Sequence, residues 1–249
     1  MLILLTNDDG INADGLKALE KALGRVADIL VFAPDREQSA SSHSLTLDRP
    51  LRILERGPNR YACDGTPTDC VMLAVHGILK HRLPDMLISG INHGANMGED
   101  VTYSGTVAAA IEGATLGIPS IAASNTDSVS LDSYQPAARF MARFVRQYSK
   151  LTLSPDIFLN INFPVLNGPK FSRYAYTSLG QRRYNDIVIE KTDPRGKHYY
   201  WIGGESTWDT VEGSDFEAVS NGYVSISPLK MNFTHMESFH RLKKVKLRF

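Results

Sequence analysis

The sequence predicts an α/β protein in which helices cover both faces of a mostly parallel sheet, with β-hairpin extensions toward the C-terminus. Two observations support this fold class. Through the first two-thirds of the chain, short apolar runs alternate with segments of helical character, which is typical of buried parallel strands joined by helices. Beyond about residue 173, aromatic and β-branched residues crowd short segments separated by turn sequences, which indicates hairpins.

The strands of the sheet are predicted from continuous apolar runs of strand length. Pro34 ends the second of these runs. A small hairpin is also predicted, because Leu51–Leu54 and Arg60–Cys63 flank the turn sequence Arg56-Gly57-Pro58-Asn59. The five sheet strands are Met1–Thr6, Ile29–Ala33, Met86–Ile91, Ser120–Ser124 and Ile157–Phe163.

The helices are predicted from apolar spacing and from signals at their ends. Thr66 is an N-cap for a helix in which Pro67 suits the first turn and Asp69 favours the dipole. Gly105–Gly117, rich in alanine, and Ala137–Tyr148 are two further helices. A helix after the first strand is indicated by four apolar residues at helical spacing: Leu16, Leu19, Leu23 and Val26.

The C-terminal region differs from the rest of the chain in its sequence pattern, because aromatic and β-branched residues crowd short segments there. Its strand-like segments are expected to form hairpins outside the parallel sheet, as an arm or a subunit interface. The basic tail from His240 to Phe249 is either a solvated face or a docking strand. We therefore expect one domain over residues 1–249, with the sheet core over 1–170 and a β-rich extension over 171–249. The strand-like segments that we expect to form hairpins are Tyr174–Tyr176, Ile187–Ile189, Tyr199–Ile202 and Tyr223–Ile226.

Bulk composition narrows the classes of function. The 249 residues carry 27 Lys+Arg and 27 Asp+Glu, and this zero net charge argues against a nucleic-acid polymer as the main partner. No apolar run approaches the length of a membrane span, and Met1 enters an apolar run without a basic leader, so we expect no membrane partner and a cytoplasmic location. Cys63 and Cys70 lack a metal-binding spacing and are expected to be reduced thiols.

Two adjacent carboxylates, Asp8 and Asp9, follow the first strand. In a parallel sheet, ligands bind outside the carboxyl ends of the strands. Adjacent carboxylates repel each other and repel a phosphate, and a divalent cation with a preference for oxygen ligands resolves both conflicts. The alternative interpretation is a solvated Asp-Asp-Gly turn.

Two further strand ends and one helix start add polar groups at the same edge. The loop Pro34–Ser44 is dense in hydroxyls, and Ser89–Gly98 contains three glycines and two asparagines. The turn Tyr103–Thr106 leads into the alanine-rich helix, whose N–H groups form an anion site, although Ser104 also suits a simple N-cap. Together these groups indicate a metal beside an oxyanion site, and hydrolysis of a phosphate ester is the simplest chemistry that uses both.

The same segments resemble the SurE family of survival-protein nucleotidases. The matching motifs are NDDG at residues 7–10, APDR..S..S.SLT at 33–46, GTPTDCV at 65–71, SGIN.G.N.G.D..YSGTV at 89–107 and GYVSISPL at 222–229. The resemblance implies a Rossmann-like core and one divalent cation, Mg²⁺ or Mn²⁺, with Asp8 and Asp9 as catalytic residues. It implies the metal ligands Asp8, Asp9, Ser39 and Asn92, and a phosphate-binding side formed by Asn96, Ser104, Gly105 and Thr106.

The activity that the resemblance implies is hydrolysis of nucleoside 5′- and 3′-monophosphates, in some members with polyphosphate. It also implies homodimers or homotetramers built through C-terminal β-extensions. His43 and His93 are candidates for proton donor to the leaving oxygen, or are ordinary loop histidines.

Other classes of protein fit the sequence less well. A phospho-acceptor receiver domain would bind magnesium at the Asp8-Asp9 pair, but it needs an aspartate after strand three and a lysine after strand five. The sequence has Asn92 and Phe163-Pro164 there. A haloacid-dehalogenase-type phosphatase needs Asp-x-Asp, and a dinucleotide-binding dehydrogenase has no use for the acidic turn.

Overall fold

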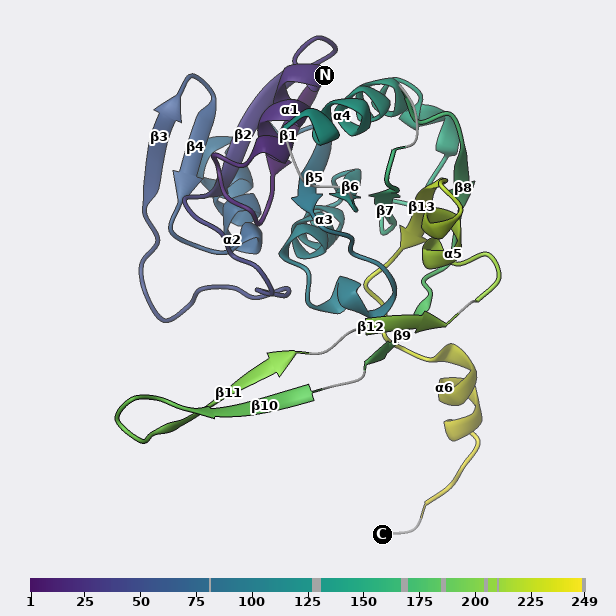
Figure 1. Ribbon diagram of the computed structural model, residues 1–249. Coiled ribbons are helices and arrows are strands. Elements are labelled where there is room, and N and C mark those ends of the chain that lie inside the picture. Colours follow the sequence, from purple (N-terminus) through teal and green to yellow (C-terminus); the bar gives the residue numbers. More distant parts are fainter. Residues whose placement is uncertain are drawn as a thin grey trace.

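The computed structural model of the protein describes residues 1–80, 82–126, 131–166, 170–184, 187–203, 206–209 and 211–247. Within these ranges the main sheet contains β1 (Leu2–Thr6), β2 (Asp28–Pro34), β3 (Ile53–Gly57), β4 (Arg60–Cys63), β5 (Met86–His93), β6 (Ser120–Asn125), β7 (Phe158–Phe163), β8 (Tyr174–Tyr176) and β13 (Val224–Leu229). Their spatial order is β3-β4-β2-β1-β5-β6-β7-β13-β8 (Figure 1). The neighbours from β4 to β7 all run parallel, which confirms the predicted α/β fold class.

The central strands are buried on both faces, and β1 shows how the sequence achieves this. Ile3 and Leu5 belong to one hydrophobic core, and Leu4 between them belongs to a second core on the opposite face. Successive side chains of a strand point to opposite faces, so a continuous apolar run supplies both cores at once. This is why the strand appears in the sequence as an unbroken apolar stretch.

Helices cover both faces, as predicted. α1 (Asp14–Leu23) packs with α4 (Leu131–Val145) over the core that contains Ile3, and α2 (Pro67–Met72) packs with α3 (Gly105–Thr115) over the other. Thr66 caps α2 in a full capping box with Asp69, which confirms the predicted helix start. The remaining helical segments are η1 (Leu73–Ile78), η2 (Gly98–Thr102), η3 (Tyr148–Leu151), α5 (Asp215–Ser220) and α6 (Met236–Leu242).

Two segments that were predicted as hairpins outside the parallel sheet are instead part of it. Tyr174–Tyr176 forms β8 and Tyr223–Ile226 falls largely in β13, which pairs antiparallel with β7 and parallel with β8. The prediction was wrong for these segments because β8 is short and largely exposed, while β13 alternates apolar residues with buried serines. Both strands therefore show the mixed polar and apolar pattern of a hairpin. Their partners are distant in sequence and leave no local signal.

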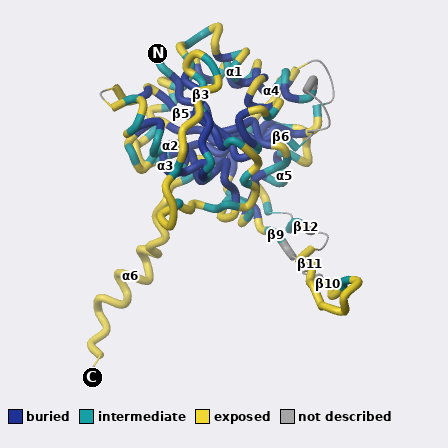
Figure 2. The backbone as a smooth tube through the Cα atoms, turned by 90° about the vertical axis from the view of Figure 1, so that its left-hand side faces the viewer, coloured by how far each residue is buried: buried dark blue, intermediate teal, exposed yellow. Residues whose placement is uncertain are grey.

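The other two segments do form a hairpin, as predicted. β10 (Ile187–Thr192) pairs antiparallel with β11 (His198–Gly203), and a second pair, β9 (Gln181–Tyr184) with β12 (Ser206–Asp209), lies at its base. We call β9 to β12 the arm. Figures 1 and 2 show that β10 and β11 extend away from the main body.

The base of the arm is attached to the loop that follows β5. The backbone N–H of Arg182 donates to Glu99 at 2.7 Å, and its guanidinium pairs with Asp100. Nearby, the buried carboxylate of Asp215 accepts N–H groups from Gly98 at 2.9 Å and from Gly180 at 2.8 Å. One end of the arm is therefore joined to the edge of the sheet where the site residues lie.

The C-terminal tail is helical over α6 and exposed in Figure 2. Residues 248 and 249 of the predicted basic tail lie outside the described residues. In the described ranges, no helix is both long and apolar enough to cross a membrane. Cys63 and Cys70 are buried free thiols, as expected.

Candidate metal and phosphate site

Three strand ends and one helix start meet at the carboxyl edge of the sheet. The backbone N–H of Gln38, after β2, donates to the carbonyl of Asp8 at 2.8 Å. The N–H of His93, at the end of β5, donates to Oδ2 of Asp9 at 3.1 Å. The N–H of Ser42 donates to the carbonyl of Tyr103, just before α3, at 3.1 Å. The structure thus brings together the segments that the sequence predicted to share one site.

Asp8 is the most buried acid of the site, with 5% of its surface exposed. Its Oδ1 accepts a hydrogen bond from the hydroxyl of Thr106. Burial raises the pKa of Asp8 to about 6, and the neighbouring charge of Asp9 adds to the rise, while the Thr106 hydroxyl opposes it. A nearby positive charge would stabilise the ionised form of this buried carboxyl.

Asp9 lies beside it and is partly exposed. Burial raises its pKa, and the charge of Glu37 adds to the rise, whereas the N–H and charge of His93 oppose it. Two carboxylates whose ionised forms are both disfavoured therefore stand next to each other at this edge.

Asn92 and Ser39 complete the set of predicted metal ligands. The side-chain NH₂ of Asn92 donates to the carbonyls of His93 and Gly94 at 3.3 and 2.9 Å, so Oδ1 is the atom that it can offer a cation. Ser39 is exposed, and its hydroxyl donates to Glu37 at 2.6 Å. Ser39 directly follows Gln38, the residue that holds this loop to Asp8.

Gly105 keeps space open beside the Asp8 carboxyl. A Cβ at this position would lie 2.6 Å from Oγ of Ser41, 2.8 Å from Cβ of Asp8 and 3.1 Å from its Oδ2. The Ser41 hydroxyl is buried and has no hydrogen-bond partner among the described residues. The sequence analysis did not single out Ser41, because a serine-rich loop does not show which hydroxyl turns inward.

The predicted phosphate-binding residues are held by bonds within the protein. The Ser104 side chain caps α3 by accepting the N–H of Val107 at 3.1 Å, as the N-cap interpretation proposed. The hydroxyl of Thr106 is directed at Asp8. The atoms that this turn offers to an anion are therefore the first backbone N–H groups of α3.

Asn96 is fixed by a buried polar cluster at the ends of β6 and β7. Its backbone N–H donates to Oδ1 of Asn162 at 2.9 Å, and its Nδ2 donates to Ser124 at 2.8 Å. Its carbonyl accepts from the amides of Asn160 and Asn162 at 2.8 and 2.9 Å. The sequence analysis missed these asparagines, which alternate along an apolar strand and appear there as isolated polar residues.

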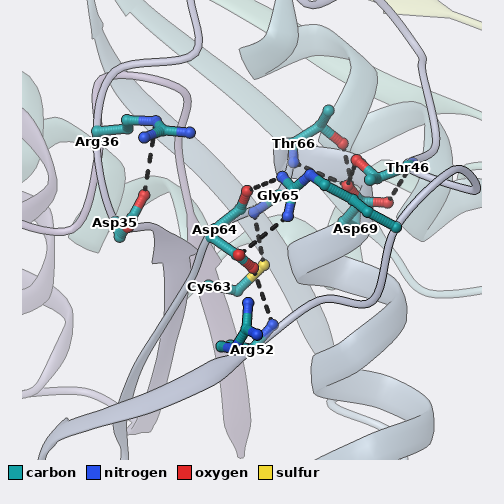
Figure 3. A network of polar contacts seen from close by, with 10 residues as sticks. Asp35, Arg36, Thr46, Arg52, Cys63, Asp64, Gly65, Thr66 and Asp69 are labelled. Atoms are coloured by element: carbon teal, nitrogen blue, oxygen red, sulfur yellow. Dashed lines mark hydrogen bonds and ion pairs between the residues drawn. The ribbon is translucent and has the colours of Figure 1, made fainter.

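The loop after β2 is anchored at two places. Nε2 of His43 lies 2.7 Å from Oε2 of Glu112 on α3. Thr46 donates its N–H and its hydroxyl to Asp69 at 3.0 and 2.6 Å, at the capped start of α2 (Figure 3). His43 thus contacts a helix carboxylate, and His93 is exposed at the rim.

Comparisons with known proteins identify a family that matches most of the chain. A family model described as "Survival protein SurE" matches residues 3–186. The protein named 5′-nucleotidase SurE from Geotalea daltonii is 47% identical over 245 residues, which cover 98% of this chain and 98% of the relative. The protein of the same name from Geobacter metallireducens is 48% identical over 244 residues, covering 98% and 96%. The crystal structure of the SurE protein from Aquifex aeolicus matches with a TM-score of 0.87, at 40% identity and 98% coverage of both chains.

Proposed function

Since this chain belongs to the survival protein SurE family, we propose that it is a divalent-metal-dependent phosphatase that converts nucleoside monophosphates to nucleoside and phosphate. The relatives named 5′-nucleotidase support the substrate class. We further propose the 5′-monophosphates as main substrates, with 3′-monophosphates and short polyphosphate as additional ones.

The observation that carries this proposal is the Asp8-Asp9 pair. Asp8 is buried with a raised pKa and lies against the first turn of α3, where backbone N–H groups favour an anion. The residues fit a hard cation because each proposed ligand offers an oxygen atom: Asp8, Asp9, Ser39 and Asn92. When bound, Mg²⁺ or Mn²⁺ supplies Lewis-acid polarisation of the phosphoryl oxygen and a more acidic water.

The other residues position the substrate. The N–H groups of Gly105 and Thr106 donate to the phosphate, and Ser104 keeps them in place by capping α3. Asn96 shapes the adjacent wall, because its backbone is fixed from both sides. A receiver-like signalling role has no support here, since β5 ends with Asn92-His93 in place of the aspartate such a domain phosphorylates.

Removing divalent metal should abolish hydrolysis. Without a cation, two adjacent carboxylates face the phosphate and repel it. Phosphate release is measured on 5′- and 3′-mononucleotides and polyphosphate, after exhaustive chelation and after adding back Mg²⁺ or Mn²⁺. We expect release only in the metal-supplemented samples, with 5′-mononucleotides among the best substrates. Full turnover in the chelated sample would overturn the metal dependence, and no release from any nucleotide would overturn the substrate class.

We also propose that the arm mediates self-association into a homodimer or homotetramer. The hairpin is exposed along its length, with Tyr200 at 59%, Trp201 at 63% and Ile202 at 86%. An isolated two-stranded hairpin is marginally stable in water, and aromatic residues are enriched at interface cores. A second subunit is the partner that this hairpin fits.

Shortening the arm should release smaller species. In the variant, a Gly-Ser linker joins Tyr184 to Ser206, so that β9, β12 and the contacts of Arg182 to Glu99 and Asp100 are kept. Light scattering is expected to show an oligomer for the full chain and a smaller species for the variant. A monomeric full chain at micromolar concentration, or an unchanged mass for the variant, would contradict the role of the arm. Circular dichroism of both proteins is the control for folding.

A further inference from the structure

A groove of about 610 Å³ lies on the α4 face of the main sheet, apart from the carboxyl-end site. Its walls come from the second half of α4, from η3, and from the segment that leads into β8. Cavities of this size commonly hold a small organic ligand. None of the proposed metal or phosphate residues lines it.

The charge of the groove is one-sided. Arg143, Lys150 and Lys170 line it, and none of the lining residues that the structure describes is acidic. No ion pair joins any of the three to a carboxylate within the described part of the chain. Three cations that face one hollow without a counter-charge favour an anionic occupant.

The groove is also lined by aromatic rings. Tyr174 and Tyr176 stand edge to face on β8, with centroids 5.7 Å apart, and are 55% and 60% exposed. On the α4 side, Phe140 and Phe144 lie with centroids 6.1 Å apart. Exposed tyrosine rings present faces on which a planar ring stacks.

The groove is distant from the Asp8-Asp9 pair. Its sheet wall includes Ile226 on β13, which is separated from β1 by β5, β6 and β7. Four strand spacings of roughly 4.8 Å place this wall about 19 Å from β1 across the sheet. One small ligand therefore does not occupy both places.

We propose that this groove is a second binding site, for a mononucleotide, with the base against the tyrosines of β8 and the phosphate between Arg143 of α4, Lys150 of η3 and Lys170. A nucleotide combines a planar ring with a compact dianion, which matches the two kinds of lining residue. The chain's own exposed tail is a poor occupant, because the sequence of α6 and of the residues after it has the single acid Glu237 against Arg241, Lys243, Lys244, Lys246 and Arg248. Like charges across a contact are unfavourable.

The first test measures binding of adenosine 5′-monophosphate to the full chain by calorimetry in excess chelator, which blocks hydrolysis under the proposed function. The variant Arg143→Glu/Lys170→Glu reverses two groove charges. Arg139→Glu/Arg146→Glu is the matched control, because Arg139 on α4 and Arg146 directly after it are both exposed and neither lines the groove. We expect affinity to fall by about tenfold or more in the groove variant and by less than about twofold in the control.

The second test locates the site. Photo-crosslinking with 8-azidoadenosine 5′-monophosphate, followed by peptide mapping, is expected to label peptides from α4 or β8. Labelling confined to residues 92–106 would overturn the second site and leave the proposed hydrolysis untouched. If phosphate release were absent while the groove was still labelled, the proposed hydrolysis would be overturned and the second site would stand.

Three other results would also overturn this inference. Equal affinity in the groove variant and wild type would show that the cations do not bind the ligand. Competition by inorganic phosphate at the same concentration as the nucleotide would show that the rings contribute nothing. A change of mass in light scattering, caused by the groove variant but not by its control, would identify the groove as a contact between subunits.

Discussion

Replacing Asp9 with asparagine should lower kcat for phosphate release by about 10²- to 10³-fold, and Asp8→Asn should do the same. Each change removes one negative charge from the pair that we assign to the metal, while it keeps the size of the side chain. The pKa of both carboxyls is raised by burial. The raised pKa of each carboxyl means that its ionised form destabilises the metal-free fold at neutral pH. An asparagine at either position carries no charge, so we expect it not to destabilise the metal-free fold in this way.

Steady-state kinetics with saturating Mg²⁺ or Mn²⁺ measures the effect, and thermal unfolding in chelator checks the fold. The matched control is Asp14→Asn, an exposed acid in the first turn of α1, which should leave kcat unchanged. Near-normal turnover of either variant, or failure of either to fold, would remove these residues from the proposed machinery.

Replacing Gly105 with alanine should lower kcat by about a hundredfold without unfolding the protein. The new Cβ would lie 2.8 Å from Cβ of Asp8 and 2.6 Å from Oγ of Ser41, so that the Asp8 carboxyl or the start of α3 has to shift. Misplacing a reacting group by about 1 Å costs on the order of 10² in rate. The helix itself accepts alanine better than glycine, by up to about 1 kcal/mol, which offsets part of the strain.

A second variant separates the two contacts. Ser41→Ala removes the hydroxyl and leaves the contact with Asp8, so Gly105→Ala/Ser41→Ala should stay as slow as Gly105→Ala alone. Recovery of kcat in the double variant would show that only Ser41 was displaced. A Gly105→Ala enzyme with normal kcat would show that the space beside Asp8 is not needed.

The sequence predicted the parallel core well, because burial on both faces leaves a signal in each strand by itself. Met1–Thr6 is unbroken in its apolar character and becomes β1 almost to the residue. The start of α3 was equally clear, since Ser104 before an alanine-rich stretch is a local capping signal. Because these strands run parallel, the loops that follow them lie at one edge of the sheet.

Features that depend on partners distant in sequence could not be predicted in this way. β13 was misplaced because its pairing with β7 joins residues far apart in the chain. The start of α4 at Leu131 was placed too late, at Ala137, because the helix continues through Pro136. Within the site, the resemblance to the SurE family indicated Thr106 as a phosphate ligand, whereas in the structure its hydroxyl is directed at Asp8.

The hydrogen bonds at the base of the arm also determine how this edge of the protein opens. The amides of Gly98 and Gly180 both donate to Asp215, and the amide of Arg182 donates to Glu99 in the same loop. These three amides come from two segments more than eighty residues apart in sequence, and the carboxylate of Asp215 holds both segments. We therefore expect the three amides to exchange as one cooperative unit, with a shared opening free energy. The protection of the loop beside the candidate phosphate site is thereby set in part by residues at the base of the arm.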